Sequence, residues 1–276
     1  MITKPLLQQY QTIMDNPKAF PSWAKKKKHN QNEFIKCTIP FVGKNYFCHK
    51  PRILVYASAE NLTKYTGEFD RDGDAVNRHR AYFDDPKKRE DRYFPSIHLQ
   101  PFDDGSLATA VLYIATKLFE IPCNISPAVF YEQIAIGNYC KYTIESDEKN
   151  IDYATDAKKL SYSRSFIEAD IAFLKPDVII MPKSIYKSEK SFVDTIKGSA
   201  RVIPISQINS GTINRTISKK NGRKPKRRSD LAPCVKTWYD NLCENGISGD
   251  TKENYLYVFS YIDEELDKEN RNILCP

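Results

Sequence analysis

The sequence predicts an α/β fold of three layers, with helices on both sides of a central sheet of four parallel strands. The main observation is a series of short apolar runs that alternate with helical segments, which is typical of βαβ crossovers. In these runs apolar residues follow one another with little polar alternation, as in strands buried on both faces. The predicted strands are residues 53–57, 133–138, 177–181 and 201–205.

Helical segments precede, separate and follow these strands. Leu6, Leu7, Tyr10 and Ile13 recur at helical spacing near the beginning of the chain. Ser106 suits the N-cap of one later helix, and Gly198 suits the C-cap of another. The later helices are predicted at residues 107–120, 156–174, 188–197 and 231–244.

The chain of 276 residues has room for one large α/β domain with appendages. We predict an N-terminal extension of helical and short β structure at residues 1–50, followed by the α/β domain at residues 51–276. The domain carries a long insertion, residues 62–105, which is rich in charged and aromatic side chains. It also carries a basic loop at residues 211–229.

The net charge of +7 is concentrated in this basic loop. A block of like charges repels itself unless an anionic partner neutralises it. A nuclear-localisation signal or a solubilising loop would have the same composition, but this loop follows the last predicted strand, at the edge where a site is expected. We therefore expect an anionic partner. Eight cations contribute: Arg215, Lys219, Lys220, Arg223, Lys224, Lys226, Arg227 and Arg228.

The cysteine pattern argues against a metal centre. The seven cysteines are widely spaced and form no Cys-x-x-Cys pair, so the usual spacing of zinc or iron–sulfur ligands is missing. We expect no metal, no iron–sulfur cluster and no other cofactor. The first residues do not resemble a signal peptide, and no apolar run is long enough to span a bilayer. The expectation is a cytoplasmic protein with reduced thiols and no membrane partner.

Small and polar residues follow the first predicted strand abruptly. Ser58, Glu60 and Asn61 come directly after the apolar run 53–57. In open α/β sheets, ligands bind in the crevice outside the carboxyl ends of the strands. This stretch is therefore either part of a ligand site or an ordinary solvated loop.

Three stretches, in this order, resemble the uracil-DNA glycosylase superfamily over about residues 51–215. Residues 134–141, Ile-Ala-Ile-Gly-Asn-Tyr-Cys-Lys, look like its strand that ends in Asn with a Lys and a Cys nearby. Residues 173–180, Phe-Leu-Lys-Pro-Asp-Val-Ile-Ile, are similar to its passage from helix to strand. Residues 202–207 occupy the place of its last strand, which ends in a turn like His-Pro-Ser.

This chain departs from the superfamily at two motifs. Residues 57–61, Ala-Ser-Ala-Glu-Asn, replace the Gly-x-x-Pro-Gly of many members. His-Pro-Ser is replaced by residues 207–209, Gln-Ile-Asn, or by residues 209–211, Asn-Ser-Gly, if the register shifts by two. The resemblance implies a monofunctional DNA glycosylase that hydrolyses the N-glycosidic bond of a flipped base. Uracil and a modified base, such as a modified cytosine in foreign DNA, both stay open as substrates. DNA repair and defence against phage DNA therefore stay open as roles.

The resemblance implies that a carboxylate or amide positions a water molecule below the sugar. Three residues are candidates for this catalytic role. Glu60 is our first choice and Asn61 lies in the same motif. Asp104 lies in a segment, Phe-Asp-Asp-Gly-Ser, that resembles the Phe-x-Gly-Asp-x-Ser of one branch.

The flipped base would need a stacking ring and polar groups at its edge. Phe102, and as a second choice Phe94, would stack on it. The amide of Asn138 offers both a donor and an acceptor to the base edge, although an Asn can also simply cap a strand end. Gln207 or Asn209 would stabilise the departing base.

In the superfamily, the loop after the last strand enters the DNA stack beside the flipped nucleotide. Ser210 and Ile213 lie in that loop here, and Ile213 is its apolar wedge. The eight cations of the basic loop would contact phosphates, which position the protein but carry little sequence information. The alternative to an enzyme is a nucleic-acid-binding protein of the same fold that has lost catalysis.

Overall fold

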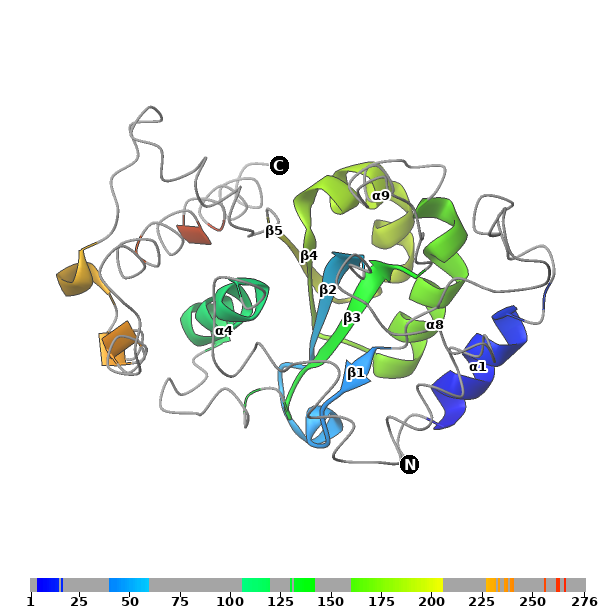
Figure 1. The fold of residues 1–276 in the computed structure, drawn as a ribbon, viewed down its shortest axis with the longest axis horizontal. Helices are drawn as coiled ribbons and strands as arrows, with labels where there is room; N and C mark the ends of the chain where they lie inside the picture. Colours follow the sequence, from blue (N-terminus) through cyan, green and yellow to red (C-terminus); the bar gives the residue numbers. More distant parts are fainter. Residues whose placement is uncertain are drawn as a thin grey trace, which may run out of the picture. The chain divides into compact units, whose positions relative to one another are not determined.

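The computed structural model describes residues 4–14, 16, 40–59, 106–119, 130, 132–141, 160–205 and 227–231, together with isolated positions from 233 to 266 (Figure 1). The chain divides into two units. Unit 1 contains Met1–Tyr93 and Gln133–Pro204, and unit 2 contains Phe94–Glu132 and Ile205–Pro276. Two elements of the predicted N-terminal extension, a helix and a short strand, belong to unit 1.

A mixed sheet of five strands organises unit 1, in the order β1-β3-β2-β4-β5 (Figure 1). The central strand β2 pairs in parallel with β3 on one side and with β4 on the other. Its first four residues are at most 1% exposed, as expected for an apolar run covered on both faces. The strands are β1 (Phe41–Val42), β2 (Ile53–Ala59), β3 (Ala135–Cys140), β4 (Val178–Pro182) and β5 (Arg201–Ile205).

The predicted α/β class is confirmed, and β2 pairs in parallel with β3 and with β4 as predicted, but the sheet has five strands rather than four. β1 is a fifth strand and pairs antiparallel with β3, where Phe41 lies opposite Ile136. The Gly43 N–H donates to the carbonyl of Ile134 at 2.9 Å and continues this pairing. β1 thus occupies the side of β3 that would otherwise be an open edge with unpaired backbone groups.

The strand boundaries agree closely with the sequence pattern except at β3 and at the end of β2, which continues two residues beyond residue 57 to Ala59 and so includes Ser58. β5 has the predicted bounds, and β4 is displaced by one residue. β3 begins and ends two residues later than predicted. The sequence pattern placed Asn138 at the end of this strand because a polar residue interrupts the apolar run there, but Tyr139 and Cys140 continue the strand and are buried.

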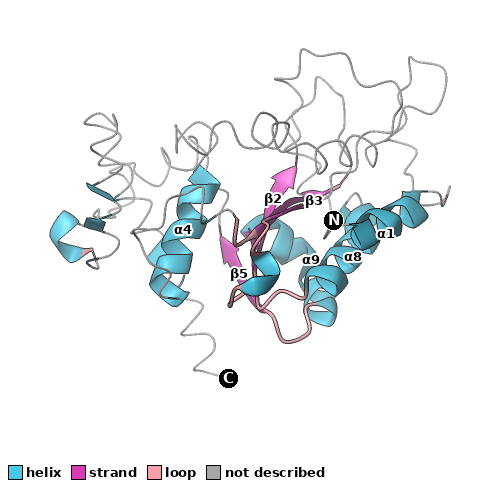
Figure 2. Ribbon diagram, turned by 90° about the horizontal axis from the view of Figure 1, so that it is seen from below, coloured by secondary structure: helices cyan, strands magenta, loops and turns pink. Residues whose placement is uncertain are grey.

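Three helices of unit 1 pack on one face of the sheet: α1 (Lys4–Met14), α8 (Arg164–Leu174) and α9 (Lys183–Ile196) (Figure 2). α1 confirms the first predicted helix. α8 begins after a 3-10 turn, η5 (Ser161–Ser163), and so starts later than residue 156, the predicted start. α9 begins five residues before its predicted start, because β4 leads directly into it. Helices on the second face, which the three-layer fold requires, stay a prediction.

The helix α9 ends as the sequence predicts. Lys197 closes its last turn, and Gly198 follows with a φ of 58°. Glycine adopts this left-handed conformation without the steric cost that a side chain would impose.

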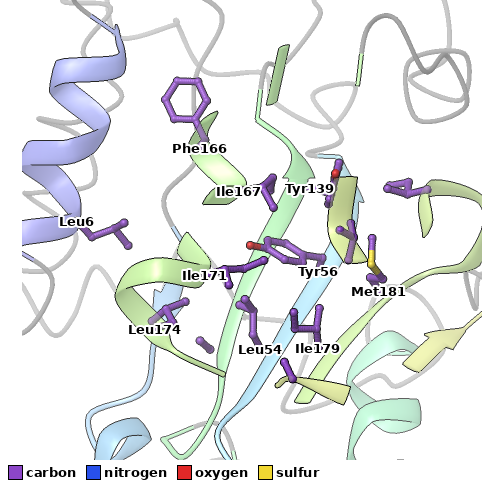
Figure 3. Close-up of a cluster of buried hydrophobic side chains, with 14 of the residues drawn as sticks. Leu6, Leu54, Tyr56, Tyr139, Phe166, Ile167, Ile171, Leu174, Ile179 and Met181 are labelled. Carbon is purple, nitrogen blue, oxygen red and sulfur yellow. The ribbon is translucent and has the colours of Figure 1, made fainter. Parts of the chain in front are cut away.

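The core of unit 1 lies between the sheet and α8 (Figure 3). Four apolar residues of α8 recur at intervals of one, three or four positions and form the stripe that faces the sheet. They are Phe166, Ile167, Ile171 and Leu174. The same cluster contains Leu54 and Tyr56 of β2, Ile179 and Met181 of β4, and Leu6 of α1. Burial of these side chains fixes the helix layer on this face.

In unit 2, the helix α4 (Ser106–Phe119) confirms the helix predicted at 107–120. Ser106 is its first residue rather than the cap before it. A buried carboxylate, Asp263, accepts a hydrogen bond from the hydroxyl of Tyr113 at 2.8 Å and pairs with Lys117. The only described residues of the basic loop also belong to unit 2, and Arg228 begins the 3-10 turn η7 (Arg228–Asp230) there.

At the amino end of β4, Asp177 joins two segments of unit 1. It accepts hydrogen bonds from Lys50 Nζ at 2.8 Å and from the backbone N–H of Arg52 at 2.7 Å. Burial alone would raise the pKa of Asp177, but these donors outweigh it and lower the pKa to about 2. Asp177 therefore ties the start of β2 to the start of β4 in its charged form.

This ion pair makes the stability of unit 1 depend on pH. Because the pKa of Asp177 is lower in the folded than in the unfolded chain, its contribution is complete above about pH 4 and is lost as the pH falls toward 2. The side chain is 32% exposed, so solvent screening limits the contribution to about 1–2 kcal/mol. In urea unfolding, Asp177→Asn should be less stable than the wild type by this amount at pH 7, and the difference should shrink steadily below pH 4.

The matched control is Glu168→Gln at an exposed position of α8, which should change the free energy of unfolding by less than about 0.5 kcal/mol at either pH. A difference between Asp177→Asn and the wild type that stays constant down to pH 2 would contradict the assigned ion pair.

Candidate functional site

The order of the strands marks the carboxyl end of β2 as the place for a ligand. Among β2, β3, β4 and β5, β2 comes first in the sequence. β3 lies on one side of it in the sheet, and β4 and β5 lie on the other side. The crossovers therefore reverse direction at β2 and β4, which is the topological switch point where ligands of open α/β sheets bind. β2 ends at Ala59, and Glu60 and Asn61 are the next residues in the sequence.

Asn138 lies beside this end of β2. In the parallel register, Ala57 of β2 is opposite Asn138 of β3 and Ala59 is opposite Cys140. Side chains alternate along a strand, so Asn138 lies on the sheet face opposite to that of Tyr139, which belongs to the core beneath α8. Its side chain is half-buried. The sequence predicted Asn138 as the last residue of its strand, whereas it lies two residues before the end of β3 and stays beside the end of β2.

The other side of the switch point is the beginning of α9. No acidic residue lies in its first turn, and its N-cap, Pro182, provides no side-chain hydrogen bond. Lys183, Ser184 and Lys187 are exposed there. The N-terminus of a helix carries a partial positive charge, so this edge of the sheet is favourable to anions.

Most of the predicted site residues lie outside the described part of the chain. These are the catalytic candidates Glu60, Asn61 and Asp104, the base-binding candidates Phe94, Phe102, Gln207 and Asn209, and the DNA-binding candidates Ser210, Ile213, Arg215, Lys219, Lys220, Arg223, Lys224 and Lys226.

The two described cations of the basic loop are exposed. Arg228 donates from Nε to Asp240 Oδ1 at 2.6 Å and makes a second bond from Nη2 to the other carboxylate oxygen. The backbone N–H of Arg227 donates to Asp230 Oδ2 at 3.0 Å. Asp240 thus partly neutralises the end of the basic loop.

On the face of the sheet opposite to that of Asn138, four side chains form a group that we call the buried polar cluster: Tyr10, Tyr56, Lys141 and Asp170. Lys141 follows β3 directly, and its Nζ lies 2.7 Å from Asp170 Oδ2 of α8. The hydroxyl of Tyr10 donates to Asp170 Oδ1 at 2.6 Å, and that of Tyr56 donates to Asp170 Oδ2 at 3.1 Å. Both charged side chains are 0% exposed, so one carboxylate joins α1, β2, β3 and α8 inside the protein.

The charges of the cluster balance one another. Burial raises the pKa of Asp170, while the Lys141 ammonium and the two tyrosine hydroxyls offset this in part. Burial and the adjacent carboxylate raise the pKa of Tyr56, so its hydroxyl remains protonated and donates. The ammonium also lies 5.4 Å and 5.6 Å from the ring centroids of Tyr10 and Tyr56, a favourable cation–π arrangement.

A second buried carboxylate, Glu189 of α9, lies on the same face. Its Oε2 accepts from Arg164 Nε at 2.8 Å and from the Tyr139 hydroxyl at 3.2 Å. Next to Tyr139, burial raises the pKa of the Cys140 thiol, which makes it a poor nucleophile. The two buried carboxylates beneath this face, Asp170 and Glu189, are therefore hydrogen-bonded structural groups.

The sequence-based prediction missed these buried acids, although a signal for them was present. Asp170 is three residues after Ile167 and four before Leu174, so it lies within the apolar stripe of α8. Glu189 likewise lies four residues from both Ile185 and Val193, which are buried. A carboxylate on the apolar face of an amphipathic helix indicates a buried, paired acid.

Among the residues that the structure describes, no group of three or more His, Cys, Asp or Glu side chains could hold a metal ion. In the same part of the chain, no helix is long and apolar enough to cross a membrane. Comparisons of the sequence with protein-family models and curated proteins, and of the structure with solved structures, found no match.

Proposed function

We propose that this protein is a DNA glycosylase that hydrolyses the N-glycosidic bond of a flipped uracil or modified base and leaves an abasic site. The observation that carries the proposal is the position of β2 at the topological switch point of the sheet. The stretch that follows it, Glu60-Asn61, contains the acid and the amide that the chemistry requires.

Two further features support DNA as the substrate. A flipped nucleotide brings phosphates to the enzyme. The start of α9 is favourable to anions, because its N-cap, Pro182, provides no side-chain hydrogen bond and its first residues include Lys183 and Lys187. The basic loop adds cations that would hold the phosphate backbone on either side of the target.

The proposed reaction needs charge stabilisation on both sides of the breaking bond. Positive charge develops on the sugar, where Glu60, Asn61 or Asp104 would orient the attacking water and accept its proton or stabilise the charge. Negative charge develops on the leaving base, where Gln207 or Asn209 would donate hydrogen bonds. Asn138 would read the base edge while Phe102 or Phe94 stacks on the ring.

An assay for abasic sites tests the proposal. We expect the purified protein to release one base from a panel of labelled single- and double-stranded DNAs, seen as strand breaks after alkali treatment. The panel contains uracil, hypoxanthine, xanthine, 5-hydroxymethyluracil, and 5-hydroxymethylcytosine with and without glucose. The base that is released names the substrate and separates a repair role on uracil from a defence role on modified phage DNA.

DNA of the same sequence without any altered base is the control and should stay intact. Binding that weakens with salt but leaves no abasic site on any member would contradict the enzyme and support a non-catalytic DNA-binding protein.

A further inference from the structure

The carboxylate of Asp170 is shared by the two strands that border the proposed site. Its Oδ2 accepts from Tyr56 of β2 at 3.1 Å and from Lys141, the residue after β3, at 2.7 Å. β2 and β3 are neighbours in the sheet, so one buried oxygen atom connects Tyr56 of β2 with the residue that follows β3, on the face of the sheet that α8 covers.

A second contact, from the residue before α8, fixes the carboxyl end of β3. The backbone N–H of Lys141 donates to Ser163 Oγ at 3.0 Å, and Ser163 is fully buried immediately before α8. The main chain and the side chain of Lys141 are therefore both fixed by one rigid element. Little freedom remains for the end of β3 to shift along or away from β2.

These attachment points lie close in sequence to the proposed site. Tyr56 precedes Glu60 by four residues, and Lys141 follows Asn138 by three. Catalytic groups must be held within a fraction of an ångström of their productive positions, and supporting hydrogen bonds provide that precision.

We propose that Asp170 is a positioning residue for the glycosylase site, which holds the carboxyl ends of β2 and β3 in register through Tyr56 and Lys141. This inference rests on the proposed function. Asp170 lies on the other face of the sheet from Asn138 and acts only through the strands.

Stability alone is a weak reason for this cluster. A buried ion pair often contributes no more to stability than well-packed apolar residues of similar volume would. Two of the bonds to the Asp170 carboxylate come from β2 and from the residue that follows β3, the strands beside the proposed site. Apolar side chains in the same place would not fix the relative positions of these two strand ends.

The two tyrosines provide a matched test, because each loses the same hydroxyl when it is replaced by phenylalanine. Tyr56→Phe removes the bond from β2, whereas Tyr10→Phe removes the bond from α1, which is not part of the sheet. In steady-state base release, Tyr56→Phe should lower kcat by roughly 10-fold with little change in KM, and Tyr10→Phe should change kcat by less than about 2-fold. Both variants are assayed at a temperature where unfolding curves show them fully folded.

Hydrogen exchange of the protein without DNA provides a readout that does not depend on activity. Tyr56→Phe should speed exchange of the amides at residues 57–59 and 138–141, and leave those of α9 unchanged. Equal losses of kcat in both variants, or unchanged exchange at the strand ends, would overturn the positioning role. If the wild type releases no base at all, the proposed function fails, and exchange alone decides whether Asp170 holds the strand ends.

Discussion

Replacing Lys141 by methionine should lower the free energy of unfolding by about 3–5 kcal/mol, because it leaves the Asp170 carboxylate buried without its ammonium partner. Both side chains are 0% exposed, so water cannot substitute for the lost charge without local opening. Urea unfolding at pH 7 measures the change. A loss of this size is a large part of the stability of an ordinary domain.

The double variant Lys141→Met/Asp170→Asn is the control that separates charge from packing. Its asparagine keeps an oxygen that accepts from one tyrosine hydroxyl, offers its NH2 to the hydroxyl oxygen of the other, and removes the buried charge, so it should recover most of the loss. A single variant that costs less than about 1 kcal/mol would contradict a fully buried ion pair. A double variant as unstable as the single one would show that the methionine itself does not fit.

The parts of the fold that the sequence predicts well are those whose information is local. β2, β4 and β5 are apolar runs that end at small or polar residues or at a proline. Such runs can be predicted from the local sequence, without knowledge of which strands lie beside them. The pairing of β1 with β3 joins Val42 to Ala135 and Phe41 to Ile136, which are 93 and 95 positions apart, and only the folded chain brings them together. Short β structure was predicted in residues 1–50, but its pairing with β3 and its antiparallel direction could not be predicted from local patterns.

The same distinction holds for the polar groups. The position of Asp170 on an apolar helix face indicates that it is buried, but its partners come from three other elements. Tyr10 is 160 residues away and Tyr56 is 114 residues away. Asn138 shows a related difficulty, since a polar residue within a buried strand resembles a strand end. In each case the missing information was which segments meet, not what each segment prefers.

Glu60→Gln should lower the rate of base release by roughly 10²–10⁴-fold if Glu60 positions the water. The substitution keeps the size and hydrogen-bonding capacity of the side chain but removes the negative charge and the basicity. Binding of the DNA should change little, because phosphate contacts provide most of the affinity. Single-turnover release on the substrate found in the base panel measures the rate, and titration of the same DNA measures Kd.

Asp104→Asn is the matched variant, since it makes the same chemical change at the other acidic candidate. If Glu60 carries the role, Asp104→Asn should keep the rate of base release within about 10-fold of the wild type, because a residue that only supports the site contributes less than the one that orients the water. The reverse pattern would assign the water to Asp104, near the end of the insertion 62–105. It would leave Glu60 as a polar residue at the end of β2. Because the two acids are 44 positions apart in the chain, the comparison also decides which segment provides the residue that orients the water.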